Sequence, residues 1–235
     1  MCTVSYVCSN GKIIITSNRD EQVERPATAP QNFLVNQKNI IFPKDPKAGG
    51  SWFAIDEEAN VLVLLNGAAE KHVWNPPYRR SRGLILLDII SSPIPLEHWE
   101  SIDLNEIEPF TLVLYAAQKL YQLRWNGDGK ECIKLDEKGP HIWSSSTLYT
   151  VEAHQKHIGW FNQFLDTKPT VEENEMFNFH RYTEETDGNE GLVINRNEKL
   201  KTLSITQVVI DKNKISMVHH DLVEKNMSNH SFMIV

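Results

Sequence analysis

The chain has 235 residues, enough to bury about 70–75% of its unfolded surface in a core, so no disulfide framework is needed. Its 24 basic and 31 acidic residues give a formal net charge of −7, which argues against a nucleic-acid partner. The three cysteines, Cys2, Cys8 and Cys132, are not in CxxC spacing, which indicates a reducing, cytoplasmic compartment and no zinc site.

The beginning of the chain does not resemble a signal peptide, because its apolar residues alternate with polar ones. No stretch approaches the roughly eighteen apolar residues that a membrane span requires. We therefore expect a soluble protein whose residues 1–235 form a single domain, and the sequence leaves the oligomeric state open.

The first predicted element is a β-hairpin. Apolar residues alternate from Val4 onward, and the pair Asn10-Gly11 separates this run from the next, which begins at Ile13. Both turn residues tolerate the positive φ of a type I′ turn. In such a hairpin the numbers of paired residues sum to about 21, so Cys2 is predicted within about one position of Arg19.

The next predicted elements are an irregular segment, two strands and a helix. Residues 22–50 contain four prolines and few periodic runs, which predicts an irregular excursion. The strands "SWFAID" and "NVLVLLNG" follow, and then a helix over Ser81–Ser91 with Ser81 as its cap. The basic run Arg79-Arg80-Ser81-Arg82 is interpreted as a solvated loop or helix start.

The second half of the chain predicts another meander, two helices and a last hairpin. The runs "FTLVLYAA", "LYQLRW" and "ECIKL" are expected to be strands, and "HIWSSSTLY" to be a strand that leads into a helix near 150–165. A helix near 170–180 is expected to begin with a capping box of Thr170 and Glu173. The final hairpin joins "TLSITQVVID" to "KISMVHHDL". This order indicates an α+β fold with helices on the faces of two antiparallel sheets.

Cys2 is a candidate nucleophile. If Met1 is removed, Cys2 gains a free α-amine with a pKa of about 7.7–8.0, close to the thiol value of about 8.5. That amine then serves as the base for its own thiol. Arg19 and Asp20 carry the charges needed to stabilise a thiolate and to orient the amine. The alternative is a buried strand cysteine without reactivity, with Asn18-Arg19-Asp20-Glu21 as a polar strand end.

Three ordered motifs in the first third of the chain resemble a known family. "MCTVSY", "SNRDEQVERP" and "GGSWFAIDEEANVLVLLNGA" are similar to the NRDE family of transport and Golgi organisation proteins. This family resembles the N-terminal-nucleophile cysteine acylases, which include bile-salt and penicillin V hydrolases. The resemblance implies a four-layer αββα sandwich of mostly antiparallel sheets.

The same resemblance implies roles for individual residues. Cys2 corresponds to the nucleophile and general base, Asp20 to the residue that orients the amine, and Asn66 to an oxyanion-stabilising asparagine. Arg19 belongs to the NRDE run, whereas the acylases place their arginine two positions earlier, at Ser17. The implied activity is an amidohydrolase that cleaves C–N bonds other than peptide bonds in a small acylated substrate.

Two departures from the acylase pattern favour a rival function. The second oxyanion asparagine is replaced within Ser144-Ser145-Ser146, where the Ser145 hydroxyl is the candidate substitute, and a late arginine aligns with Leu203. The rival is a protein that binds or carries a small ligand, such as a lipid or haem, without turnover. Apart from that rival, no cofactor is expected.

Other motifs add no further activity. His154 and His157 share a predicted helix face and His219-His220 lie in a late strand, but neither pair has the three or four convergent ligands of a metal site. The sequence has no phosphate-binding loop and no GxSxG motif, so it gives no support for nucleotide binding or serine esterase chemistry.

Overall fold

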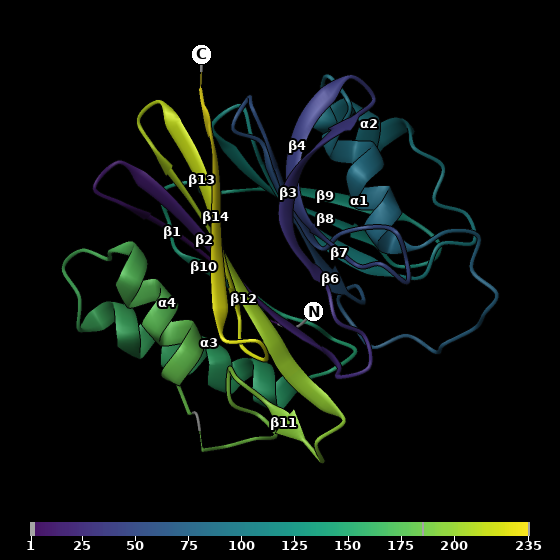
Figure 1. Cartoon of the computed structure of the whole chain (residues 1–235). Helices are drawn as coiled ribbons and strands as arrows, with labels where there is room; N and C mark the ends of the chain where they lie inside the picture. Colours follow the sequence, from purple (N-terminus) through teal and green to yellow (C-terminus); the bar gives the residue numbers. More distant parts are fainter. Residues whose placement is uncertain (1–2, 185, 235) are drawn as a thin grey trace.

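The computed structural model describes residues 3–184 and 186–234. Within these residues the chain forms two antiparallel sheets of seven strands each, sheet A and sheet B, which pack face to face. Two helices cover the outer face of each sheet, so the layers run helix, sheet, sheet, helix (Figure 1). The predicted α+β sandwich is confirmed.

Sheet A has the strand order β10-β1-β2-β12-β13-β14, with the short β11 paired to β12. Its strands are β1 Thr3–Ser9, β2 Lys12–Gln22, β10 His141–Ser144, β11 Asn195–Arg196, β12 Leu200–Asp211, β13 Lys214–Asp221 and β14 Asn226–Met233. The first hairpin forms as predicted, from Ser9 opposite Lys12 to Thr3 opposite Asn18. The φ angles of 52° at Asn10 and 77° at Gly11 explain why this pair makes the turn.

Sheet B has the strand order β3-β4-β5-β6-β7-β8-β9. Its strands are β3 Thr28–Val35, β4 Lys38–Lys44, β5 Phe53–Asp56, β6 Val61–Asn66, β7 Phe110–Ala116, β8 Lys119–Trp125 and β9 Lys130–Leu135. The prediction of an irregular excursion over 22–50 is therefore wrong. Asn36 and Gln37, with φ of 49° and 68°, form a tight turn, and Pro30 is tolerated because β3 is an edge strand with a shifted register there.

The helices α1 Arg82–Ile90 and α2 Pro95–Ser101 pack on sheet B, and α3 Val151–Asp166 and α4 Glu173–Tyr182 pack on sheet A. The structure differs from two predictions about the helix N-caps. Ser81 is the N-cap of α1 but makes no capping hydrogen bond through its side chain. The capping box of α4 uses Glu172 and Glu175, not Thr170 and Glu173.

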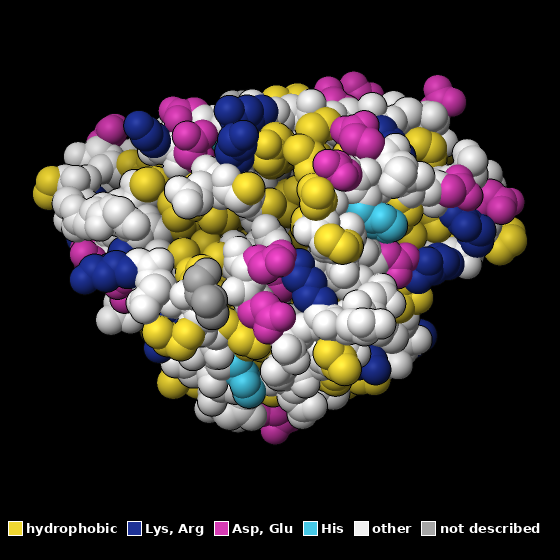
Figure 2. Space-filling view, turned by 90° about the horizontal axis from the view of Figure 1, so that it is seen from above, with side chains coloured by type: hydrophobic (Ala, Val, Ile, Leu, Met, Phe, Trp, Pro, Cys, Tyr) yellow, Lys and Arg dark blue, Asp and Glu magenta, His cyan; other side chains and the backbone are white. Residues whose placement is uncertain are grey.

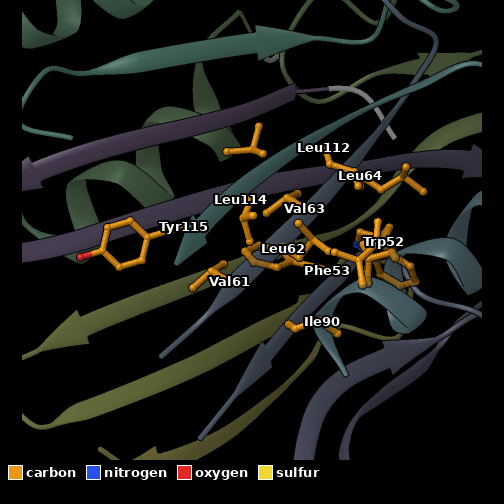
Figure 3. Packing of buried hydrophobic residues seen from close by; sticks show 14 of the residues in the cluster. Trp52, Phe53, Val61, Leu62, Val63, Leu64, Ile90, Leu112, Leu114 and Tyr115 are labelled. Carbon is orange, nitrogen blue, oxygen red and sulfur yellow. The ribbon is translucent and has the colours of Figure 1, made fainter. Parts of the chain in front are cut away.

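The main hydrophobic core fills the space between the sheets and the interface of α1 with sheet B. Figure 3 shows part of it, with Phe53 of β5, Leu62 of β6 and Leu114 of β7 drawn together with Ile90 of α1. In the view from the end of the sandwich where the C-terminus lies, hydrophobic side chains gather above the centre, and a small group of acidic and basic side chains lies directly below them (Figure 2). A separate cluster lies between sheet A and the helices α3 and α4.

A close contact between two glycines brings the start of α1 against the segment between β4 and β5. A Cβ atom on Gly50 would lie only 2.6 Å from the backbone nitrogen of Leu84, and one on Gly83 would lie 2.7 Å from the carbonyl oxygen of Ser51. Any larger residue at either position would force the two segments apart. Gly50 of the "GGSW" motif and Gly83 therefore allow the start of α1 to lie against the segment that contains Trp52.

Candidate active site

The end of β2 directs successive side chains to opposite faces of sheet A. Arg19 points into the space between the sheets, where its guanidinium carbon lies 4.6 Å from the centre of the Trp52 ring. Its Nη1 donates to the carbonyl oxygen of Arg25 at 3.0 Å, and its Nη2 lies 3.7 Å from the Asp45 carboxylate. A cation–π contact and a carboxylate thus accompany this almost fully buried charge.

Asp20 points toward the helices α3 and α4 and is also buried. Its carboxylate accepts a hydrogen bond from the Tyr149 hydroxyl at 3.1 Å and another from the Thr202 hydroxyl at 2.5 Å. The Thr202 oxygen in turn accepts from the backbone N–H of Ile194 at 2.8 Å. These contacts fix the orientation of the carboxylate.

Asn18 links β2 to α4 through a buried polar network. Its Nδ2 donates to the carbonyl oxygens of His180 and Leu192, so its Oδ1 is the acceptor for His180 Nδ1–H at 2.6 Å. The other ring nitrogen of His180 then accepts from the Ser5 hydroxyl at 2.7 Å. This arrangement requires a neutral imidazole, and burial, with a smaller contribution from the charge of His157, lowers the pKa of His180 to about 3.

His157 of α3 makes a similar network with β10. Its Nε2–H donates to the carbonyl oxygen of Glu190 at 2.9 Å, so Nδ1 accepts from the Ser144 hydroxyl at 2.7 Å. Burial lowers the pKa of His157. The ring also packs edge-on against Tyr149, with 4.6 Å between the centroids. A buried histidine thus supports the tyrosine that binds Asp20.

Asn66 at the end of β6 in sheet B and Ser145 after β10 in sheet A meet where the two sheets pack together. Asn66 ends β6, and its carbonyl oxygen accepts a hydrogen bond from the Ser145 hydroxyl at 2.7 Å. Ser145 is 1% exposed and lies 3.0 Å from the hydroxyl of Thr147. The contact uses the backbone carbonyl of Asn66, not its side-chain amide.

A cavity of about 380 Å³ opens between the end of β2, the end of β6 and the start of α1. Arg19 and Asn66 both line it, whereas Asp20 and Ser145 are not part of its wall. Its volume lies at the lower end of the range for small-molecule sites. Two of the residues singled out from the sequence therefore share one concave site, and Asp20 lies behind it on the other face of β2.

Glu21 and Arg25 of the second motif form an ion cluster with Asp45 in the wall of this cavity. Arg25 binds the Asp45 carboxylate at 2.7 Å and the Glu21 carboxylate at 3.2 Å. Asp45 also accepts from the backbone N–H groups of Lys47 and Ala48. This cluster connects the segment after β2 to the loop that precedes β5.

Cys2 lies outside the described residues. Its neighbour Thr3 is the first residue of β1 and pairs with both Asn18 and Ser144. Leu203, the residue predicted to replace the late arginine of the acylases, lies where the register of β12 against β2 shifts, between Thr202 and Ser204. Leu203 is buried and contributes no charge there.

Sequence reasoning did not identify Tyr149, Thr202 or His180 as members of the site. Each reaches it through a contact over more than a hundred residues of sequence, and no local motif marks such a contact. Among residues 3–184 and 186–234, no group of three or more His, Cys, Asp or Glu side chains is arranged to bind a metal ion. No helix in the same part of the chain is long and apolar enough to cross a membrane.

Solved structures with a similar arrangement of sheets and helices show which fold this chain has. The Caenorhabditis elegans ortholog of N-acylethanolamine-hydrolyzing acid amidase matches with a TM-score of 0.62 and 12% sequence identity, covering 88% of this chain and 92% of that chain. An arginine-to-leucine variant of the conjugated bile acid hydrolase from Clostridium perfringens matches with a TM-score of 0.53 and 9% identity, over 100% of this chain and 97% of that one. The fold is therefore that of the N-terminal-nucleophile hydrolases.

The family is defined by the sequence. The model of the family described as Transport and Golgi organisation 2 matches residues 1–224, and the chain belongs to this family. No curated protein gives a significant match to the chain.

Proposed function

We propose that this protein is an N-terminal-nucleophile-type cysteine amidohydrolase that acts on a small acylated substrate, with Cys2 as the nucleophile. The observation that carries the proposal is the register of the first hairpin. Because Thr3 pairs with Asn18, the start of β1 lies beside the last residues of β2. Arg19, the residue after Asn18, lines a cavity together with Asn66. The fold shared with two hydrolases supports the same reading.

The proposed reaction begins after removal of Met1. The α-amine of Cys2 takes the thiol proton, and the thiolate attacks the carbonyl carbon of the substrate amide. Asn66 and backbone N–H groups stabilise the oxyanion of the tetrahedral intermediate. The C–N bond then breaks, the leaving amine takes the proton, and a thioester remains on Cys2.

Hydrolysis of the thioester completes the cycle. The α-amine accepts a proton from water, and the resulting hydroxide attacks the thioester carbon. The carboxylic acid leaves, and the proton returns to the sulfur. In this scheme Asp20, held by Tyr149 and Thr202, orients the amine, and Arg19 stabilises the negative charge of the thiolate.

The test combines intact mass with hydrolysis of fluorogenic N-acyl amides. We expect the purified chain to lack Met1 and Cys2→Ala to reduce hydrolysis by about 10³-fold or more. The exposed Cys132 provides the matched control, so Cys132→Ala keeps the activity. A thiol-directed electrophile should label Cys2 before Cys8 and Cys132. Retention of Met1 in a fully active protein excludes this mechanism.

One contact favours the second candidate, a protein that binds a small ligand without turnover. The Ser145 hydroxyl donates its proton to the Asn66 carbonyl oxygen, so in this arrangement Ser145 provides no donor to an oxyanion. The same experiment separates the two functions. A binding protein retains ligand in stoichiometric amounts, and Cys2→Ala does not change the rate at which the amide disappears.

A further inference from the structure

The wall of the candidate cavity is unusually rich in charged side chains. It contains four arginines, namely Arg19, Arg25, Arg80 and Arg82. It also contains three carboxylates, those of Glu21, Asp45 and Glu108. A long alkyl chain in this cavity would remove these groups from water without giving them partners, which is costly. The composition therefore favours a polar ligand.

The three carboxylates already have donors within the protein. Glu21 and Asp45 both bind Arg25, at 3.2 and 2.7 Å. Glu108 binds Arg82 at 3.0 Å and the ring of His72 at 3.2 Å. The acceptors in the wall are therefore engaged, and they have little capacity for a cationic ligand.

The two arginines at the start of α1, Arg80 and Arg82, bring more N–H donors than their contacts within the protein use. Each guanidinium carries five N–H donors. Arg82 donates to the carbonyl oxygen of Pro109 and binds Glu108, and Arg80 binds Asp88, a residue of α1 outside the cavity wall, at 2.6 and 3.2 Å. Burial also lowers the pKa of Arg82, because its charge is poorly hydrated. An anion placed beside it would offset that cost.

We propose that this cavity selects amides that carry a carboxylate, which the arginines around the start of α1 bind, an inference that rests on the proposed amidohydrolase function. A planar guanidinium matches a carboxylate in two parallel hydrogen bonds, so it provides specificity as well as affinity. The carboxylate belongs either to the acyl part of the substrate or to its amine part. In either position the carboxylate accepts the same hydrogen bonds from the arginines.

The test measures binding to the full-length Cys2→Ala protein by calorimetry, so that turnover does not interfere. Three probes of similar size are compared: hexanoylglycine has its carboxylate on the amine side, N-butylglutaramic acid has it on the acyl side, and N-butylhexanamide is neutral. We expect one of the two acids to bind at least about tenfold more tightly than the neutral amide. The tighter acid identifies the side of the substrate that carries the charge.

Neighbouring arginines provide a matched pair of variants. The side chains of Arg79 and Arg80 are 40% and 41% exposed and each binds a carboxylate, but only Arg80 lines the cavity. Arg80→Ala should reduce the preference for the acid to less than about threefold, and Arg79→Ala should preserve it. Because both side chains are half exposed, neither substitution threatens the fold.

The outcomes for this inference and for the proposed function are distinguishable. Equal binding of the three probes, binding of none of them, or an equal loss in Arg79→Ala and Arg80→Ala would overturn the carboxylate preference. If the acid binds preferentially but protein with an intact Cys2 does not cleave it, the inference stands and the hydrolase function fails. If that protein cleaves the neutral amide as efficiently as both acids, only the inference fails.

Discussion

The two helix–sheet interfaces of this molecule are built from different kinds of side chain. α1 contacts sheet B through aliphatic residues such as Leu86 and Ile89, which are fully buried. α3 and α4 contact sheet A through aromatic residues and through the buried His157 and His180, whose ring nitrogens are all hydrogen-bonded. Aliphatic packing tolerates small displacements, whereas hydrogen bonds between buried groups demand one geometry.

This difference coincides with the environment of Asp20, whereas the cavity lies on the other face of β2, against the start of α1. The polar interface holds Asn18 and supports Tyr149, and these residues surround Asp20 at the end of β2. The aliphatic interface holds no such residue. The α3–α4 side therefore holds Asn18 and Asp20 in place, while the start of α1 contributes Arg82 and Gly83 to the cavity wall and the rest of α1 packs on sheet B.

The largest expected effect is a loss of stability in mild acid. Burial lowers the pKa of His180 to about 3 and that of His219, also in sheet A, to about 4, against about 6.5 in the unfolded chain. Below about pH 6.5 the unfolded state therefore binds more protons than the folded state. The stability that the neutral histidines allow is complete above this pH and decreases as the pH falls below it. Urea unfolding measured from pH 7.5 to 4.5 should show little change from these groups above about pH 6.5. Below it, the free energy of unfolding should decrease with a slope that approaches about 1.4 kcal/mol per pH unit for each histidine.

A variant with a changed histidine sharpens this test. His180→Gln lowers stability at pH 7.5 but should make the pH dependence between 6.5 and 4.5 shallower. An unchanged slope in His180→Gln contradicts the assignment of a neutral buried imidazole.

The next effect concerns the aliphatic interface. Ile89→Ala removes a fully buried side chain of α1 and should lower the free energy of unfolding by about 2–5 kcal/mol, because a cavity remains. The measurement is urea unfolding at pH 7.5, with amide hydrolysis per folded molecule as the second readout. We expect that activity, and the pH slope of stability, to remain. A large loss of activity in folded protein would show that the aliphatic side also positions the site.

The corresponding change on the polar side should cost about 3 kcal/mol. Asn18→Leu leaves His180 Nδ1–H and two backbone carbonyl oxygens without this partner, and buried unpaired groups are expensive. Here hydrolysis per folded molecule should fall as well. Asn39→Leu, which removes a surface hydrogen bond to Glu57, is the control and should change neither quantity appreciably. Retained activity in Asn18→Leu contradicts a positioning role for the polar interface.

The smallest effect on stability is expected for Tyr149→Phe, at about 1 kcal/mol, because one hydrogen bond to Asp20 is removed. Under the proposed function, kcat falls while KM stays unchanged, since Asp20 does not line the cavity. Steady-state kinetics separate the two constants, and Tyr182→Phe on the exposed side of α4 serves as the control. A change in stability alone would limit Tyr149 to a structural role.

Local patterns were sufficient to predict much of this fold. Asn10-Gly11 between two alternating runs predicts both the hairpin and its register, because the turn type fixes which residues face each other. Patterns were insufficient where the signal is weak. β3 contains a proline and β14 is largely polar. Both are edge strands that pair with only one neighbour, the adjacent strand along the chain, so few of their own side chains mark them as strands.

The residues of the candidate site also differ in whether the sequence predicts them. Arg19, Asp20 and Asn66 stand out in motifs, but the partners that orient Asp20 do not. Asn18 and His180 are separated by 162 positions, and no periodicity links them. Such contacts form only when two packed layers meet, so single-sequence reasoning does not reach them.

The sequence by itself determined the first hairpin, because turn chemistry and strand alternation act over a few residues. The hairpin in turn places the start of β1 close to Asn18-Arg19-Asp20. The tertiary structure alone decided that Arg19 and Asn66 share a cavity with the start of α1, and that Asp20 faces the polar helix layer instead. Sheet packing sets these relations, since the pleat sends neighbouring residues of one strand to opposite layers.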